Sequence, residues 1–92
     1  MSNENKVKEK FRPSRLQVIA ARNLLNRMTQ EELAKAAGVS NDTISLFETG
    51  QTTPQDATLA KIQKALEDRG IIFSNGDKPS VTLDRSQAII PT

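Results

Sequence analysis

The sequence contains no cysteine and no histidine. Without cysteine there can be no disulfide, thiol nucleophile or cysteine-ligated zinc. Without histidine the commonest general base and metal ligand is missing. Aromatic residues are also scarce, with three Phe and neither Trp nor Tyr. We therefore expect no catalytic residue, no metal and no cofactor, and we exclude metalloenzymes, thiol enzymes and histidine-dependent hydrolases.

Long apolar runs are missing as well. No segment approaches the roughly 18 residues of a membrane helix, so no membrane partner is expected. No apolar region typical of a signal peptide follows the N-terminus, which predicts a cytoplasmic protein. A chain of 92 residues is expected to form one small domain. A single core of this size stabilises a fold only weakly, so a partner chain is plausible.

The charge is unevenly distributed along the chain. Residues 1–27 carry seven basic and two acidic side chains, whereas residues 28–70 carry four basic and seven acidic ones. A basic N-terminal segment on a mildly acidic body suits an anionic partner that meets one face. The alternative is a solvated tail that keeps the protein in solution. The polar composition of residues 1–12 favours a flexible basic arm.

Helical periodicity and capping signals predict four helices, at residues 14–27, 29–37, 40–49 and 53–69. The residue expected to cap the start of each is, in chain order, Ser14, Thr29, Ser40 and Thr53. Ser14 with Gln17, and Thr29 with Glu32, have the spacing of capping boxes. The apolar stripe assigned to the first helix consists of Leu16, Ile19, Ala20 and Leu24.

A short β-hairpin is predicted after Gly70. Residues 71–73 are Ile-Ile-Phe, too short for a helix, and Asn75-Gly76 is a turn signal. Residues 80–83 then alternate between polar and apolar side chains, as a half-buried strand does. The residues alone therefore predict helices followed by a pair of strands.

The spacing in residues 29–50 matches a helix-turn-helix unit, in which two short helices are joined by a tight turn containing glycine. Ala34 is small enough to let the two helices approach, and Gly38 permits the sharp turn. Val39 and Ile44 anchor the turn and the next helix to the core. The outward face of residues 40–49 is then free to enter a DNA major groove.

The run from Thr29 to Gly50 contains Thr-Gln-x-x-Leu-Ala, Gly-Val-Ser, Thr-Ile-Ser and Phe-Glu-x-Gly. It resembles the phage-repressor/Cro-like (XRE-type) helix-turn-helix transcriptional regulators, and the resemblance covers roughly residues 14–70. It implies a compact helical domain that binds operator DNA, usually as a homodimer. Together with the predicted strands, the expected fold is mainly α, a four-helix or five-helix repressor-like domain with a short C-terminal β-strand or hairpin. The expected divisions are a basic flexible arm at 1–12, the DNA-binding domain at 13–70 and a C-terminal β tail at 71–92 that forms a dimer.

The resemblance also implies which side chains meet double-stranded DNA. Bases would be read by Asn41, Asp42, Thr43, Ser45 and Leu46. Phosphates would be held by Gln30, Ser40, Gln51, Thr52 and Thr53. The basic N-terminal segment adds Arg12 and Arg15 as phosphate contacts. Asparagine can pair with adenine and aspartate can accept from cytosine, which suits a reading role. Alternatives stay open for four of these residues. Gln30 is alternatively a plain exposed residue and Leu46 a packing residue. Asp42 is alternatively a carboxylate that interacts with the helix dipole, and Thr43 a residue that supports the helix cap.

Two features depart from the family pattern. The third helix has no Arg or Lys, so phosphate charge must come from elsewhere, with Lys10, Arg27 and Lys35 as further candidates. The family commonly pairs an arginine of the first helix with the glutamate near the end of the third. Glu48 is present, but Asn23 occupies the arginine position and Arg22 precedes it. Glu48 therefore either pairs with Arg22 or bonds locally.

The C-terminal segment is rich in apolar residues that the helical core does not need. Those expected at a homodimer interface are Ile71, Ile72, Phe73, Val81, Leu83, Ile89 and Ile90. A lone hairpin is marginal in water, so pairing with a second copy would bury them. The alternative is that the segment folds back on its own domain.

These observations predict a sequence-specific transcriptional regulator that binds an inverted-repeat operator as a homodimer. The alternative is an antitoxin or protein-interaction module of the same fold, whose tail binds a protein partner. We expect no enzymatic activity, because the sequence has neither a P-loop nor a G-x-S-x-G motif.

Overall fold

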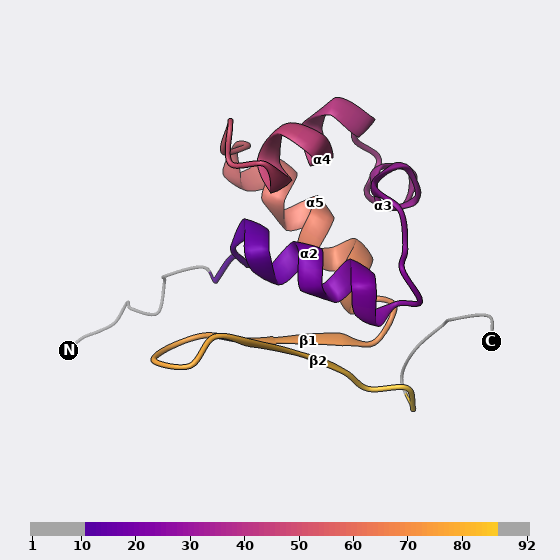
Figure 1. Cartoon of the computed structure of the whole chain (residues 1–92), viewed down its shortest axis with the longest axis vertical. Coiled ribbons are helices and arrows are strands. Elements are labelled where there is room, and N and C mark those ends of the chain that lie inside the picture. The colour runs from indigo at the N-terminus through magenta and orange to yellow at the C-terminus, as the bar shows by residue number, and fades with distance from the viewer. Residues whose placement is uncertain (1–10, 87–92) are drawn as a thin grey trace.

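The computed structural model describes residues 11–86. They form four helices, α2 (Arg15–Leu24), α3 (Gln30–Ala37), α4 (Asn41–Glu48) and α5 (Asp56–Glu67), followed by the strands β1 (Ile71–Ser74) and β2 (Ser80–Leu83). Figure 1 shows the hairpin on one side of the domain and α4 on the opposite side, with α2 between them. The predicted mainly α fold with a C-terminal hairpin is confirmed.

The helix starts follow from side-chain caps. Ser14 with Gln17, and Thr29 with Glu32, both form complete capping boxes, and the Ser40 side chain accepts from the Thr43 backbone N–H. These three caps were predicted correctly. Each satisfies backbone donors that the first turn of a helix leaves without partners.

The fourth cap was predicted wrongly. The residue that caps α5 is Gln55, not Thr53, and its side chain makes no capping bond. The Gln55 carbonyl accepts from the N–H groups of Thr58 and Leu59, both at 3.0 Å. The three residues before it therefore belong to an extended loop rather than to the helix.

The end and the buried face of the first helix also differ from the prediction. The helix stops at Leu24, because Asn26 and Arg27 adopt left-handed φ angles of 62° and 60°. Its buried face is formed by Val18 and Ala21, with Leu25 just beyond the helix. Leu16 and Leu24, assigned to the core from periodicity, are 62% and 42% exposed.

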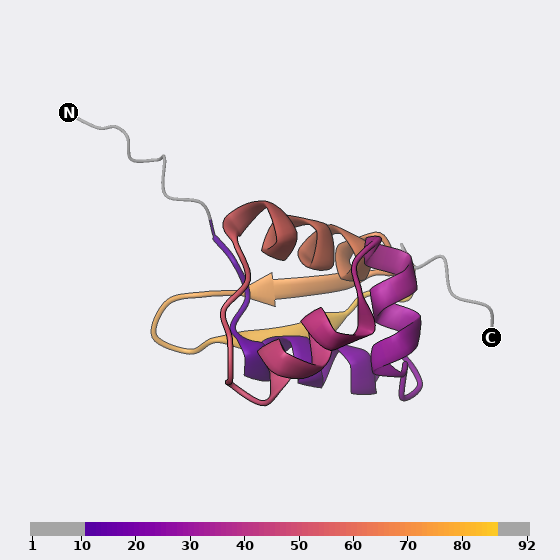
Figure 2. The same ribbon diagram turned by 90° about the horizontal axis from the view of Figure 1, so that it is seen from above.

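The core lies between the four helices and one face of the hairpin. Its largest fully buried side chains are those of Val18, Leu33, Ile44, Ile62 and Leu66. The strands pair antiparallel, with Ile71 opposite Leu83 and Phe73 opposite Val81. α2 packs against β2 and α5 against β1. In the view from above, β1 is visible between α5 on one side and α2 on the other (Figure 2).

Candidate nucleic-acid interface

The turn between α3 and α4 gives the helix pair its geometry. Gly38 ends α3 with a left-handed φ of 72°, which non-glycine residues adopt at a cost. Ala34 is 3% exposed on the inner face of α3, and its carbonyl accepts from the Val39 N–H at 3.0 Å. The chain is thereby redirected over the three residues Gly38, Val39 and Ser40, and α4 begins at Asn41.

α4 has a sharply divided surface. Ile44, Phe47 and Glu48 point inward and are buried. Asn41, Asp42 and Leu46 are exposed, and Thr43 and Ser45 are half-buried. The five side chains expected to read bases therefore all lie outside the core, on the part of α4 that solvent or a ligand can reach.

Two of these side chains, those of Asn41 and Asp42, have no hydrogen-bond partner within the described part of the domain. Their donors and acceptors are therefore available to a ligand. The Thr43 hydroxyl is different, because it shares a 2.8 Å hydrogen bond with the Ser40 hydroxyl at the start of the helix. Ser40 and Thr43 therefore stabilise the helix start as well as facing outward.

The loop after α4 lies beside this face. Leu46, Thr52 and Thr53 line a shallow hollow of about 350 Å³ together with Asp42 and Thr43. The Leu46 carbonyl accepts from the N–H groups of Gln51 and Thr52, at 2.9 and 3.2 Å, which folds the loop back against the helix. The structure thus brings most of the predicted base and phosphate residues onto one surface.

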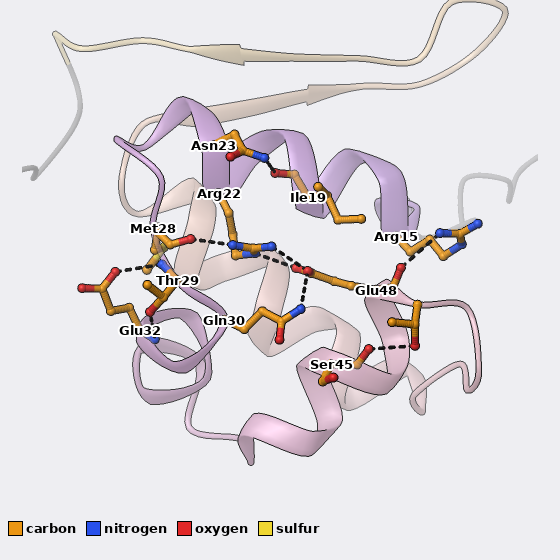
Figure 3. A network of polar contacts seen from close by, with 11 residues as sticks. Arg15, Ile19, Arg22, Asn23, Met28, Thr29, Gln30, Glu32, Ser45 and Glu48 are labelled. Atoms are coloured by element: carbon orange, nitrogen blue, oxygen red, sulfur yellow. Dashed lines mark hydrogen bonds and ion pairs between the residues drawn. The ribbon is translucent and has the colours of Figure 1, made fainter.

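Gln30 is placed differently from the sequence expectation. Its amide Nε2 donates to Glu48 Oε1 at 2.9 Å, inside the domain (Figure 3). The amide that was expected to meet a phosphate therefore has an internal acceptor. Its role in this structure is to join α3 to α4.

The two predicted phosphate arginines also have internal partners. Arg12 donates to both carboxylate oxygens of Asp56, at 2.9 and 3.1 Å, and to Gln63. Arg15 donates to the Glu48 carbonyl at 3.0 Å, at the C-terminal end of α4. The Arg12 bonds tie the segment before α2 to α5, and the Arg15 bond ties the first residue of α2 to α4. Of the two, Arg15 is the one whose side chain is exposed.

The pairing left open for Glu48 is resolved by the structure. Arg22 donates from Nε and Nη2 to the two Glu48 carboxylate oxygens, both at 2.7 Å. Asn23, which stands at the family's arginine position, instead donates to the Ile19 carbonyl of its own helix at 3.0 Å (Figure 3). Arg22 therefore supplies the family's ion pair from one residue earlier.

The C-terminal residues predicted to form a dimer interface divide into two groups. Ile71 is 2% exposed, and Phe73, Val81 and Leu83 pack partly buried against the core. Ile72 is 48% exposed on the other face of the hairpin. Within residues 71–83 the chain thus folds back on its own domain, and Ile89 and Ile90 lie outside the described residues.

Sequence reasoning did not identify the residue that fastens the hairpin. Gln17 Nε2 donates to the carbonyls of Ser74 and Ser80, at 2.9 and 3.2 Å. Its Oε1 accepts from the Ser14 N–H as part of the capping box. Gln17 and its neighbour Val18 are both buried on the inner side of α2. In the sequence, the one sign of this buried contact is that Gln17 adjoins the apolar residue Val18.

Comparison with known families supports the geometry. A helix-turn-helix family model matches residues 18–67, which is more than half of the chain. No curated protein matches the sequence. In residues 11–86, none of the helices combines the length and the apolar character needed to cross a membrane. The chain belongs to the Cro/C1-type (XRE) helix-turn-helix family and is a DNA-binding transcriptional regulator rather than a member of an enzyme family.

Proposed function

We propose that this regulator recognises a specific inverted-repeat operator as a homodimer. The observation that supports the proposal most strongly is the outward face of α4, where Asn41 and Asp42 have no internal partner. Side chains that are polar, exposed and unengaged at the start of a recognition helix are positioned to meet base edges in the major groove.

The proposed division of labour follows from the chemistry of each side chain. Asn41 can donate to and accept from adenine, and Asp42 can accept from the cytosine amino group. Leu46, 36% exposed, offers an apolar surface to a thymine methyl group. Thr43 and Ser45 complete the reading surface with hydroxyl groups.

In this proposal, residues outside α4 make the contacts to the DNA phosphates. The loop residues Gln51, Thr52 and Thr53 are exposed beside the reading face and carry side-chain amide and hydroxyl groups that can donate to phosphate oxygens. Positive charge must come from outside α4, which contains no Arg or Lys. Arg15 and the basic residues of segment 1–10 are the candidates, and a basic arm can also enter the adjacent minor groove.

The homodimer is proposed because one helix-turn-helix unit reads only a few base pairs. Two copies related by a two-fold axis place their reading helices about 34 Å apart, one turn of DNA, on matching half-sites. Occupancy of such a site would then block or recruit the polymerase.

Selection of bound duplexes from a random DNA pool tests the proposal. The full chain should enrich a palindromic motif whose half-sites are spaced by about 10 base pairs. An Asn41→Ala/Asp42→Ala variant is the matched control, because both side chains are exposed and their loss leaves the core intact. Enrichment of no motif by the parent protein, or of the same motif by both proteins, would refute base reading by α4.

A second candidate is a protein-interaction module, for example an antitoxin, that uses the same fold. The observation that favours it is the exposure of Leu16 and Leu24 on α2, away from the reading face. Purification of the full chain from its native cells distinguishes the two, because this candidate requires a second protein at a fixed stoichiometry.

A further inference from the structure

Exposed apolar side chains lie along one side of α2. Four large apolar residues among those described are exposed, and two of them, Leu16 and Leu24, belong to α2, whereas Ile72 lies on the face of the hairpin that points away from the core. The fourth is Leu46 on α4. Single exposed apolar residues are common on protein surfaces, whereas a contiguous group of them marks an interaction site. This side of α2 is therefore a candidate binding surface.

A groove of about 730 Å³ runs between α2 and β2 on this face. Its lining includes Leu16, Ala20 and Leu24 from α2, and Pro79 and Val81 from the hairpin. None of its lining residues is charged. The three α2 positions are four residues apart, so they form a continuous stripe with a small residue at its centre.

The outer edge of β2 borders the same groove. The Asp84 N–H donates to the Gly70 carbonyl at 2.8 Å, in register with the pairing of Ile72 and Thr82. Because hydrogen-bonded and non-hydrogen-bonded pairs alternate in an antiparallel ladder, Val81 and Leu83 direct their N–H and C=O groups away from β1. Among the described residues β2 has β1 as its single neighbour, so this edge is open.

We propose that a second copy of the chain occupies this face, with β2 pairing antiparallel to β2 of the second copy. Val81 of each copy would then pair with Leu83 of the other and satisfy the open edge of both strands. Above this pairing the two α2 helices would cross at Ala20, whose small side chain allows close approach. Leu16 of one copy would lie near Leu24 of the other, which buries the stripe.

Three features favour a second copy over another occupant. An antiparallel strand edge is complementary to itself under a two-fold axis, and an uncharged groove lets identical chains meet without like-charge repulsion. The third feature is the direction of α4. The two-fold axis would run from the hairpin toward α4, so both reading helices would face the same side (Figures 1 and 3). The inference thus rests on the proposed function and deepens it by naming the dimer surface.

Sedimentation equilibrium on the full chain tests this interface. Leu16→Glu and Leu24→Glu place a carboxylate in the apolar groove at positions that are exposed in one copy, so both variants should fold. Each should weaken self-association about 100-fold or more, because a buried unpaired charge is costly. The control is Ala57→Glu, which adds the same charge at an exposed position on α5 and should leave the dimer unchanged.

Two results would overturn the inference. One is a parent protein that remains monomeric throughout the micromolar range. The other is a Leu16→Glu variant that remains as dimeric as the parent. If Ile89→Glu dissociates the dimer while Leu16→Glu does not, the C-terminal segment holds the copies together and the proposed surface is again refuted.

Binding to a duplex carrying one half-site separates this inference from the proposed function. The parent and the Leu16→Glu variant should bind the half-site equally, whereas only the parent should bind the full inverted repeat tightly. If neither protein binds any selected DNA, the proposed function fails, and the sedimentation result alone still decides whether α2 and β2 form the dimer surface.

Discussion

Arg22 on α2 and Glu48 on α4 form a bidentate ion pair inside the domain, with both nitrogen–oxygen distances at 2.7 Å. The Arg22 side chain is 14% exposed and that of Glu48 is 3% exposed. Gln30 of α3 donates to the same carboxylate, and Arg22 also donates to the Met28 carbonyl. This network joins three helices and therefore fixes the orientation of the reading helix relative to the rest of the domain.

Removal of one partner of this pair should be costly. Arg22→Ala leaves the Glu48 carboxylate buried without its cation, and we expect the free energy of unfolding to fall by about 3–5 kcal/mol. Urea denaturation followed by circular dichroism measures the change. Lys64→Ala is the control, because its ion pair with Asp68 is solvent-exposed and should contribute at most about 1 kcal/mol. Equal losses for the two variants would contradict a structural role for Arg22.

Two adjacent leucines should respond differently to truncation. Leu25 is 7% exposed within the core, so Leu25→Ala should lower the free energy of unfolding by about 2–5 kcal/mol. Leu24 is 42% exposed, and Leu24→Ala should cost no more than about 0.5 kcal/mol in the monomer. Denaturation at a concentration where the protein is monomeric separates this effect from self-association. The reverse ranking would show that the stripe assigned from periodicity is the buried one.

The choice of base should depend on Asn41. Asn41→Ala should weaken binding to the selected operator by about 1–3 kcal/mol and relax the preference at one base pair of each half-site. Titration of a panel of single-base operator variants, followed by fluorescence anisotropy, measures both effects. Lys61→Ala, an exposed change on α5, serves as the control for general charge effects. A loss that is the same for every sequence would assign Asn41 to the phosphate backbone instead.

Operator affinity should fall steeply as salt rises. Each phosphate neutralised by Lys or Arg releases condensed counterions, so the logarithm of the binding constant should fall linearly with the logarithm of salt concentration, with a slope of about −0.9 per phosphate contact. Arg15→Gln should reduce this slope by about one if Arg15 reaches a phosphate. An affinity that does not change with salt would be incompatible with binding through the phosphate backbone.

The local structure of this protein was largely predictable from the sequence, because it depends on neighbouring residues. The Ser14, Thr29 and Ser40 caps and the turn at Gly38 each satisfy or redirect the backbone within a few positions. The same local logic predicts that Asn41 and Asp42 lie outside the core, since Ile44 and Phe47 define the inward stripe of α4. The helix-turn-helix unit and the composition of its outer face therefore follow from the sequence itself.

The tertiary structure alone decided which of two apolar stripes on the first helix is buried. Leu16, Ala20 and Leu24 share one side of α2, while Val18 and Ala21 share another side together with Leu25, and both sets satisfy helical periodicity. Packing against the other helices selected the second set. Partners distant in sequence likewise directed Arg22 and Gln30 to Glu48, and Gln17 to the hairpin carbonyls. Such contacts depend on which helices and strands pack against one another in the folded domain. The periodicity of a single segment does not contain that information.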